Sequence, residues 1–382
     1  MTTVFFALLR SGLYERPVTA GELPAVAALD ETAWAALVQL ARQQTVTGLI
    51  YRALTHLPQG VKVPGDTVLE LMVSAKAIEQ ENLRKAEVRA KLLDGYTHAG
   101  LHPVVMKGAT NAAFYAHPEL RTSGDIDLYF PPEEFKRASR LLDGWHKASD
   151  GTVHLKRGGV DIDLHDRYFD LHCAADRLPE VGTPEATILM LSAHILKHAI
   201  GAGVGIRQCC DLTMALQALR GQYDPAALRD LFRRTGTLRW NRLLFSFLAD
   251  HLGLGDQGCP EPQLGLGNDV CTPAMATNND YPDMQLDKVA DDGFPLADER
   301  VSSEPLLRIV LEGGNFGHYA EARHSAIKAG AGGDPVATRR RKRNTLGRFL
   351  HRLPFSLRYA PRETLATMLS LARGNLFRGQ SR

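Results

Sequence analysis

The sequence has few cysteines, and they are not arranged in pairs that would suit disulfides. It contains five in 382 residues, an odd number, and none of them stands in a Cys-x-x-Cys pair. A framework of disulfide bonds is therefore not expected. Cysteines used in this way favour a reducing compartment, so we expect the protein to be cytoplasmic.

Long hydrophobic runs are also missing. No stretch approaches the roughly 18 apolar residues that a membrane-spanning helix requires, so no transmembrane helix is expected. The N-terminus carries only a short apolar run, from Val4 to Leu9, with no basic residue ahead of it and no convincing cleavage site. We therefore expect this segment to begin a helix and not to act as an export signal.

The net charge is small but unevenly distributed. The whole chain carries +2, yet residues 337–382 hold 12 basic residues and one acidic residue, against 33 and 42 in the remainder. Such asymmetry indicates a tail that meets an anionic partner. Phe349, Phe355 and Tyr359 lie among the arginines, a mixture typical of contacts with nucleic acid or an anionic membrane surface. The alternative is a solvated basic face whose apolar side packs on the acidic body.

The composition is otherwise that of a globular protein, with 44% hydrophobic and 23% charged residues. The length suits two lobes, or one core with helical additions. Helical periodicity runs from Glu31 to Ala53 and from Asp66 to His98, where Gly100 is the expected C-cap. The predicted segments are an N-terminal helical segment (1–99), an α/β core (100–180), a helical domain with an irregular loop at 254–299 (181–336), and the basic tail (337–382).

The α/β core is predicted to contain a small mixed sheet. "HPVVMKG" at 102–108 is expected to form a short buried strand, and "DIDLYF" at 125–130 a second strand that two prolines end. Gly158-Gly159 separates two runs of alternating residues, which indicates a β-hairpin. The fold class is therefore α+β, with the sheet flanked by N-terminal helices and a C-terminal helical region.

Acidic residues recur on two of these strands. Asp125 and Asp127 are two residues apart, so both side chains lie on one face and repel each other. A divalent cation removes that repulsion, and Mg²⁺ or Mn²⁺ takes carboxylate and phosphate oxygens. Asp161 and Asp163 repeat the spacing, with His165 next on the same face. Acids on adjacent strands suit two ions about 3.5–4 Å apart that clamp a triphosphate.

Residues around these acids suit phosphate binding. Lys107-Gly108 follows the first strand, and a glycine there lets backbone N–H groups approach a phosphate. Lys107 adds a point charge, and Arg121 just before the acids adds a second cation. Ser123 is a nearby hydroxyl. The order of strand, glycine, helix and acidic strand, followed by an acidic hairpin, predicts a site for a nucleoside triphosphate.

The same residues resemble nucleotidyltransferases of the polymerase-β-like superfamily, and more closely their poorly characterised bacterial branch. That branch carries "LKGA", then "Y-x-x-P-x-x-R" and "DIDLLV", which correspond here to 106–109, 115–121 and 125–128. Its later "D/E-L-H" corresponds to Asp163-Leu164-His165, its helical "R-x-x-x-D" to Arg207 and Asp211, and "GGNFGH" to 313–318. The resemblance covers roughly residues 30–320 and is strongest over 104–165.

The resemblance implies Mg²⁺-dependent transfer of a nucleoside monophosphate, most simply AMP from ATP, to an unknown acceptor. It implies that Asp125 and Asp127 are metal ligands and that Asp163 is the third carboxylate. Asp161 stays an alternative third ligand, although Asp163 matches the motif. The chain departs from the superfamily in lacking Gly-Ser after the first strand, so Ser123 cannot be assumed to replace that serine.

Several residues remain open to two interpretations. His194 and His198 have the i, i+4 spacing of helical zinc ligands, yet the glutamate of a protease motif is missing, so core or substrate-lining roles are favoured. Asp211 is either a salt-bridged acid or a group near the site, and Asn315 either a turn residue or a nucleotide or acceptor contact. Two other functions compete with transfer: a nucleotide-binding regulatory protein without turnover, and a nucleic-acid-binding module that uses the tail.

Overall fold

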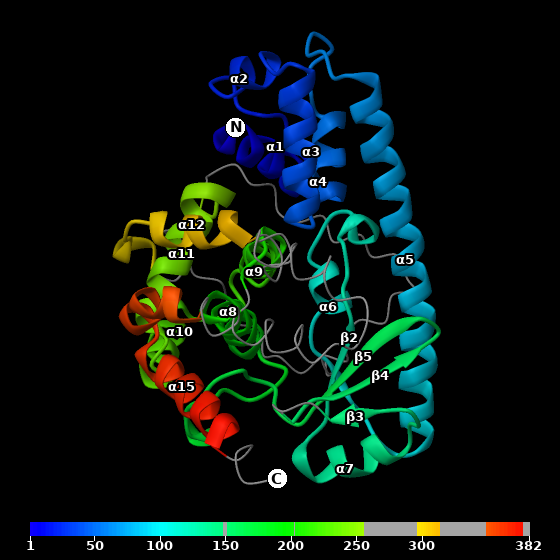
Figure 1. Ribbon diagram of the computed structural model, residues 1–382, viewed down its shortest axis with the longest axis vertical. Coiled ribbons are helices and arrows are strands. Elements are labelled where there is room, and N and C mark those ends of the chain that lie inside the picture. Colours follow the sequence, from blue (N-terminus) through cyan, green and yellow to red (C-terminus); the bar gives the residue numbers. More distant parts are fainter. Residues whose placement is uncertain (148–150, 202, 256–295, 314–348, 377–382) are drawn as a thin grey trace. The chain divides into compact units, whose positions relative to one another are not determined.

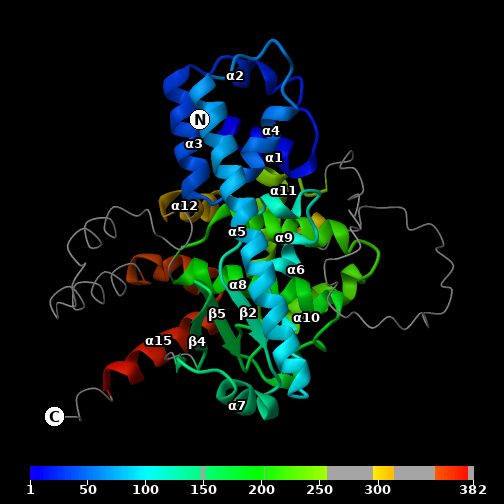
Figure 2. The same cartoon turned by 90° about the vertical axis from the view of Figure 1, so that its right-hand side faces the viewer.

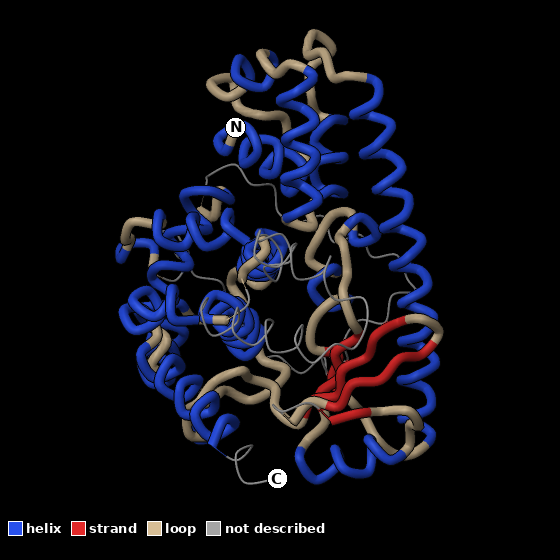
Figure 3. Tube along the Cα trace, in the orientation of Figure 1, coloured by secondary structure: helices blue, strands red, loops and turns tan. Residues whose placement is uncertain are grey.

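The chain folds into two compact units, which meet in the sequence at Tyr168 and Phe169. The computed structural model describes residues 1–147, 151–201, 203–255, 296–313 and 349–376 (Figure 1). The first unit holds helices and all the described strands, whereas the second is helical (Figure 3). The division into four segments at 99, 180 and 336 stays a prediction.

The N-terminal helices of the first unit are shorter than the sequence suggested. The single helix expected from Glu31 to Ala53 is wrong, because α3 ends at Gln43 and α4 begins at Thr47. Thr45 has a left-handed φ of 56°, and the N–H of Val46 reaches back to the carbonyl of Ala41 at 2.9 Å, which closes the helix end. The four helices here are α1 (Thr2–Tyr14), α2 (Leu23–Ala27), α3 (Glu31–Gln43) and α4 (Thr47–Thr55).

The long helix α5 (Gly65–His98) confirms the helix predicted from Asp66. Gly100 stands just past its end at φ 65°, and the N–H of Leu101 bonds the carbonyl of Tyr96 at 2.9 Å. This is the glycine-terminated helix end that the sequence predicted. Within the first unit, α5 packs on α4 near its start and runs beside the sheet near its end (Figure 2).

The sheet is small and mixed, which confirms the α+β class. Its strand order is β1-β2-β5-β4-β3, and only β2 and β5 are parallel. Gly158 and Gly159 turn between β4 and β5 at φ 54° and 76°, values that favour glycine, so the predicted hairpin is confirmed. The strands are β1 (Val104–Val105), β2 (Ile126–Tyr129), β3 (His146–Lys147), β4 (Val153–Arg157) and β5 (Val160–His165).

One face of the sheet is packed and the other carries polar groups. Ile162 and Leu164 of β5 lie in a buried cluster with residues of α5 and α7 (Pro132–Arg140). Because side chains alternate along a strand, Asp163 and His165 lie on the opposite face. The short elements between β1 and β2 are α6 (Ala109–Ala112) and the 3₁₀ turn η1 (Pro118–Leu120). The expected buried strand at 102–108 is reduced to the two half-buried residues of β1.

The described residues of the second unit form helices, joined by turns and loops. A proline opens α8 after the N-cap Thr183 and opens α10 after the N-cap Asp224, and each cap side chain accepts a backbone N–H bond. The elements are η2 (Ala175–Arg177), α8 (Pro184–Ile200), α9 (Ile206–Ala218), α10 (Pro225–Thr235), α11 (Leu238–Leu252), η3 (Ala297–Glu299), α12 (Glu304–Gly313), helical residues 349–359, and α15 (Pro361–Leu376).

The described part of the basic tail packs within the second unit. Phe349 is buried, and the guanidinium of Arg352 donates to the carbonyl of Ala199 at 3.3 Å. The buried Glu363 accepts the backbone N–H of His172 at 2.9 Å. Binding of nucleic acid by this tail stays a prediction.

Two further expectations concern the chemistry of the chain as a whole. The described cysteines are Cys173, Cys209 and Cys210, and no disulfide joins any two of them. No helix among the described residues has both the length and the apolar character that crossing a membrane requires.

Candidate metal and nucleotide site

The parallel pairing of β2 and β5 places two carboxylates side by side. Asp127 of β2 is in register with Asp163 of β5, and both lie on the polar face of the sheet. Asp127 is nearly enclosed, with 4% of its side chain exposed, and Asp163 is at 16%. The fold therefore creates the like-charge contact that the sequence predicted from separate strands.

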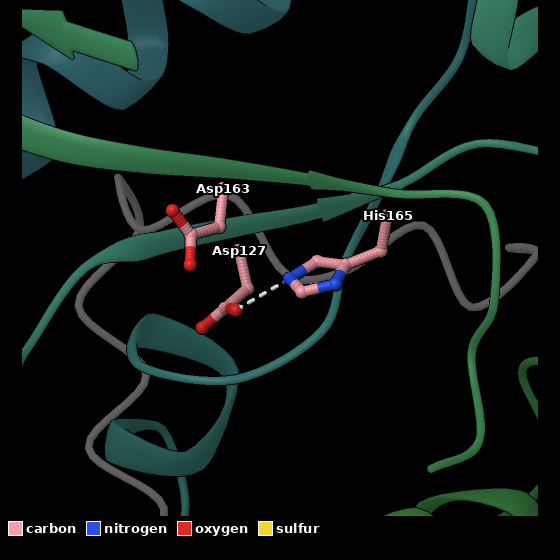
Figure 4. Close-up of side chains that lie close together, drawn as sticks. All are labelled: Asp127, Asp163 and His165. Carbon is pink, nitrogen blue, oxygen red and sulfur yellow. Dashed lines mark hydrogen bonds and ion pairs between the residues drawn. The ribbon is translucent and has the colours of Figure 1, made fainter. Parts of the chain in front are cut away.

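His165 completes this group from the end of β5. Its Nε2 lies 2.8 Å from Oδ1 of Asp127, and the imidazole ring points toward that carboxylate (Figure 4). One donor atom each from Asp127, Asp163 and His165 lies within 4.8 Å of the others. Among the described residues this is the one group of three or more His, Cys, Asp or Glu side chains close enough to share an ion.

Lys107 also reaches the buried carboxylate. It stands in the turn after β1, and its Nζ lies 3.0 Å from Oδ1 of Asp127. Gly108 follows at φ 67° and precedes α6, a helix of four residues whose dipole is small. Lys107 thus reaches the carboxylate of Asp127 from the turn after β1. Binding of phosphate by Lys107 and Gly108 stays a prediction.

Asp125 lies one residue before β2 begins, and its side chain is outside the group of three potential ligands. Its pKa is raised to about 6, first by the negative charge of Asp127, then by reduced solvation and by Asp163, while Lys107 opposes the shift. The raised pKa shows that negative charge is crowded at this point. A bound cation would relieve that crowding.

The two candidates for the third carboxylate have different surroundings. Asp161 is exposed and forms an ion pair with Lys156 of β4 at 3.3 Å. Asp163 instead meets Nδ1 of His154, also of β4, at 2.5 Å. The structure therefore brings Asp163 and not Asp161 to Asp127, and the role of Asp163 as the third ligand stays a prediction.

A row of side chains crosses four strands at this level. The register pairs His146 with His154, His154 with Asp163, and Asp163 with Asp127. The rings of His146 and His154 lie 5.4 Å apart. Neither histidine could be predicted from the sequence as part of this row, because only the pairing of β3 and β4 with β5 brings them beside Asp163 and Asp127.

The segment before β2 is held by α5. The amide of Asn82 donates to the carbonyls of Glu119 and Arg121 at 2.8 and 2.9 Å, and it accepts the hydroxyl of Ser123. Lys85 donates to the carbonyl of Ser123 at 2.8 Å. Ser123 thus points its hydroxyl at α5, and Arg121 is buried. Their roles in binding nucleotide stay predictions.

Helix α4 also fixes this segment. A Cβ on Gly48 would lie 2.1 Å from the carbonyl oxygen of Leu120, so only glycine allows η1 to approach α4 this closely. Asn82, Lys85 and Gly48 are positioning residues that sequence reasoning missed. They lie roughly 40 to 80 residues before Asp125 and Asp127 in the chain, and a polar residue or a glycine in a helix carries no signal of such a contact.

The remaining candidates belong to the second unit or lie outside the described residues. Asp211 is buried in α9 of the second unit, and Asn315 lies outside the described residues. The rings of His194 and His198 are 4.5 Å apart in α8, and Nδ1 of His194 lies 3.4 Å from Asp170. No described group of three metal-ligating residues includes either histidine.

Comparison with known proteins identifies a family that the chain matches. The sequence model of a family described as "uncharacterised nucleotidyltransferase" matches residues 30–253, more than half of the chain, and this stretch contains every residue of the group around Asp127. Neither a curated protein nor a solved structure matches the sequence.

Proposed function

Because this chain belongs to the uncharacterised nucleotidyltransferase family, we propose that it transfers a nucleoside monophosphate, most simply AMP from ATP, to a hydroxyl of an acceptor. The observation that carries the proposal is the parallel register of β2 and β5, which joins Asp127 and Asp163. Two carboxylates brought together beside a lysine suit a metal-bound triphosphate.

The residues fit a divalent cation. Carboxylate oxygens of Asp127 and Asp163 lie within the span of one coordination sphere, and the raised pKa of Asp125 reports crowded negative charge. Asp127 and Asp163 would hold Mg²⁺ or Mn²⁺, with Asp125 as a further ligand. An ion held by these residues would neutralise the triphosphate and polarise its α-phosphate.

The side chains have distinct tasks in the transfer. The acceptor oxygen forms a bond to the α-phosphorus, the bond from that phosphorus to the β-bridging oxygen breaks, and pyrophosphate leaves. Asp163 takes the proton of the acceptor hydroxyl, and the contact with His154 holds its carboxylate in place. Lys107, 3.0 Å from Asp127, pairs with the phosphates as a point charge.

The test measures transfer of label from an α-³²P nucleotide to an acceptor in cell lysate, in the presence of Mg²⁺ or Mn²⁺. Release of pyrophosphate in the same reaction is the second readout. The wild-type protein should label an acceptor, Asp127→Asn should not, and the matched variant Asp161→Asn should behave as wild type. No label transfer, no pyrophosphate and no metal-dependent nucleotide binding by the purified protein would refute the proposal.

A nucleotide-binding protein without turnover is the second candidate. It is favoured by the two contacts of Asp127 with Lys107 and His165, since protein side chains partly balance the carboxylate without a metal. Tight nucleotide binding without any transfer, across all four common nucleotides, would select it.

A further inference from the structure

We propose that the centre takes a first-row transition-metal ion in preference to Mg²⁺, with Nε2 of His165 as a direct ligand beside Asp127 and Asp163. The inference deepens the proposed function and rests on it only in using the same two carboxylates. It assigns a ligand role to a histidine whose contact with Asp127 could otherwise be a plain hydrogen bond.

The distances suit one coordination sphere. Two ligands at right angles, with metal bonds of about 2.0–2.2 Å, are separated by about 3 Å. Nε2 of His165 and Oδ1 of Asp127 lie 2.8 Å apart, and one potential ligand atom of Asp163 lies within 4.8 Å of a potential ligand atom of each of the other two residues. An ion would therefore replace the hydrogen bond between His165 and Asp127 without a rearrangement of β2 or β5.

The chemistry of the donors decides the choice of metal. Mg²⁺ takes oxygen ligands almost alone and keeps several waters, whereas imidazole suits first-row transition ions. A site built of carboxylates alone would favour Mg²⁺. An imidazole beside the carboxylates weakens that preference in exchange for one strong nitrogen bond, and Mn²⁺ is the member of the row that also accepts carboxylate and phosphate oxygens.

His154 has a different role from His165. Its Nδ1 meets Oδ1 of Asp163 at 2.5 Å, and it is absent from the group whose donor atoms all lie within 4.8 Å. We assign it as a positioning residue that orients the carboxylate of Asp163. Side chains of this kind strengthen metal binding through the ligand they hold.

Mn²⁺ alone, added to the purified full-length protein without nucleotide, tests the ligand. Pulsed electron paramagnetic resonance detects coupling of Mn²⁺ to a directly bound ¹⁴N, and calorimetry gives the affinity. Wild type and the control His154→Gln should both show the nitrogen coupling. His165→Gln should lose it, together with at least about 10-fold in Mn²⁺ affinity.

A second variant keeps the test decisive should His165→Gln fail to fold by circular dichroism. His165→Asp replaces the imidazole with a carboxylate, so it should lower the ratio of Mn²⁺ to Mg²⁺ affinity at least about 10-fold. An unchanged ratio would overturn the inference, as would nitrogen coupling that is absent in wild type or that survives in His165→Gln.

The outcomes separate this inference from the proposed function. Nucleotidyl transfer with Mg²⁺ by a protein that shows no nitrogen coupling would leave the function standing and remove the histidine ligand. Nitrogen coupling in a protein that transfers nothing would do the reverse.

Discussion

The same four residues, Asp-Ile-Asp-Leu, occur at 125–128 and at 161–164, and their surroundings differ. The second acid of each motif lies on the polar face, where the parallel register joins Asp127 to Asp163. The first acids of the two motifs have different surroundings. The negative charge of neighbouring acids raises the pKa of Asp125, whereas Asp161 forms an exposed ion pair with Lys156. A motif thus sets the face of a strand, and the neighbouring elements decide which of its carboxylates can bind an ion.

The largest expected difference between the motifs is in metal binding. Asp127→Asn removes a carboxylate shared with Lys107 and His165, whereas Asp161→Asn removes one that faces Lys156. Removing a residue that only holds a metal ligand in place lowers metal affinity about 10–100-fold. Loss of Asp127, a ligand itself in this proposal, should therefore weaken Mn²⁺ or Mg²⁺ binding by at least about 100-fold. Titration calorimetry on both variants makes the comparison, and equal losses would contradict the distinction between the acids.

The next largest effect concerns how each motif is anchored. Asn82 holds the segment before Asp125 through two carbonyls and a hydroxyl, whereas the segment before Asp161 is a hairpin turn. Asn82→Ala should lower the free energy of unfolding by about 1–3 kcal/mol, because three hydrogen bonds of the segment, each contributing about 0.5–1.5 kcal/mol, are lost together. Chemical denaturation measures it. Gln80→Ala on the exposed side of the same helix is the control and should change little.

A smaller effect separates the first acids through pH. The pKa of Asp125 is about 6 in the folded protein and about 3.9 in an unfolded chain. The folded state therefore binds more protons between these values, and metal-free stability should fall as pH rises from about 4 to about 6. Thermal unfolding in the presence of a chelator should show a shallower decline for Asp125→Asn. A decline as steep as that of wild type would show that Asp125 is not the crowded group.

The smallest effect is expected at the ion pair of the second motif. Lys156→Ala breaks the contact with Asp161. The side chain of Lys156 is 61% exposed and that of Asp161 is 70% exposed. Exposed ion pairs contribute about 0–1 kcal/mol to stability, so the free energy of unfolding should change by no more than that. Metal affinity should not change. Denaturation and calorimetry on one preparation measure both quantities. A clear loss of metal affinity would place Asp161 closer to the ion than the structure does.

Local sequence signals predicted much of the first unit. Gly100 ended α5, the two glycines formed the hairpin, and alternation placed the acids of β5 on one face. The break at Thr45 was missed because helical periodicity runs through it, and its left-handed φ depends on how the turn is packed. His146, His154 and Asn82 were missed because each joins the acids only through a contact with a residue far along the chain.

The sequence by itself determined that the chain has acidic strands, a lysine-glycine turn and a small mixed sheet among helices, since these follow from side-chain period and turn chemistry over a few residues. The tertiary structure alone decided that Asp127, Asp163 and His165 form the group close enough to share an ion, and that Asp125 is not part of it. The physical reason is that register between strands fixes which side chains touch, and register is set by the packing of the whole sheet against α5 and α7.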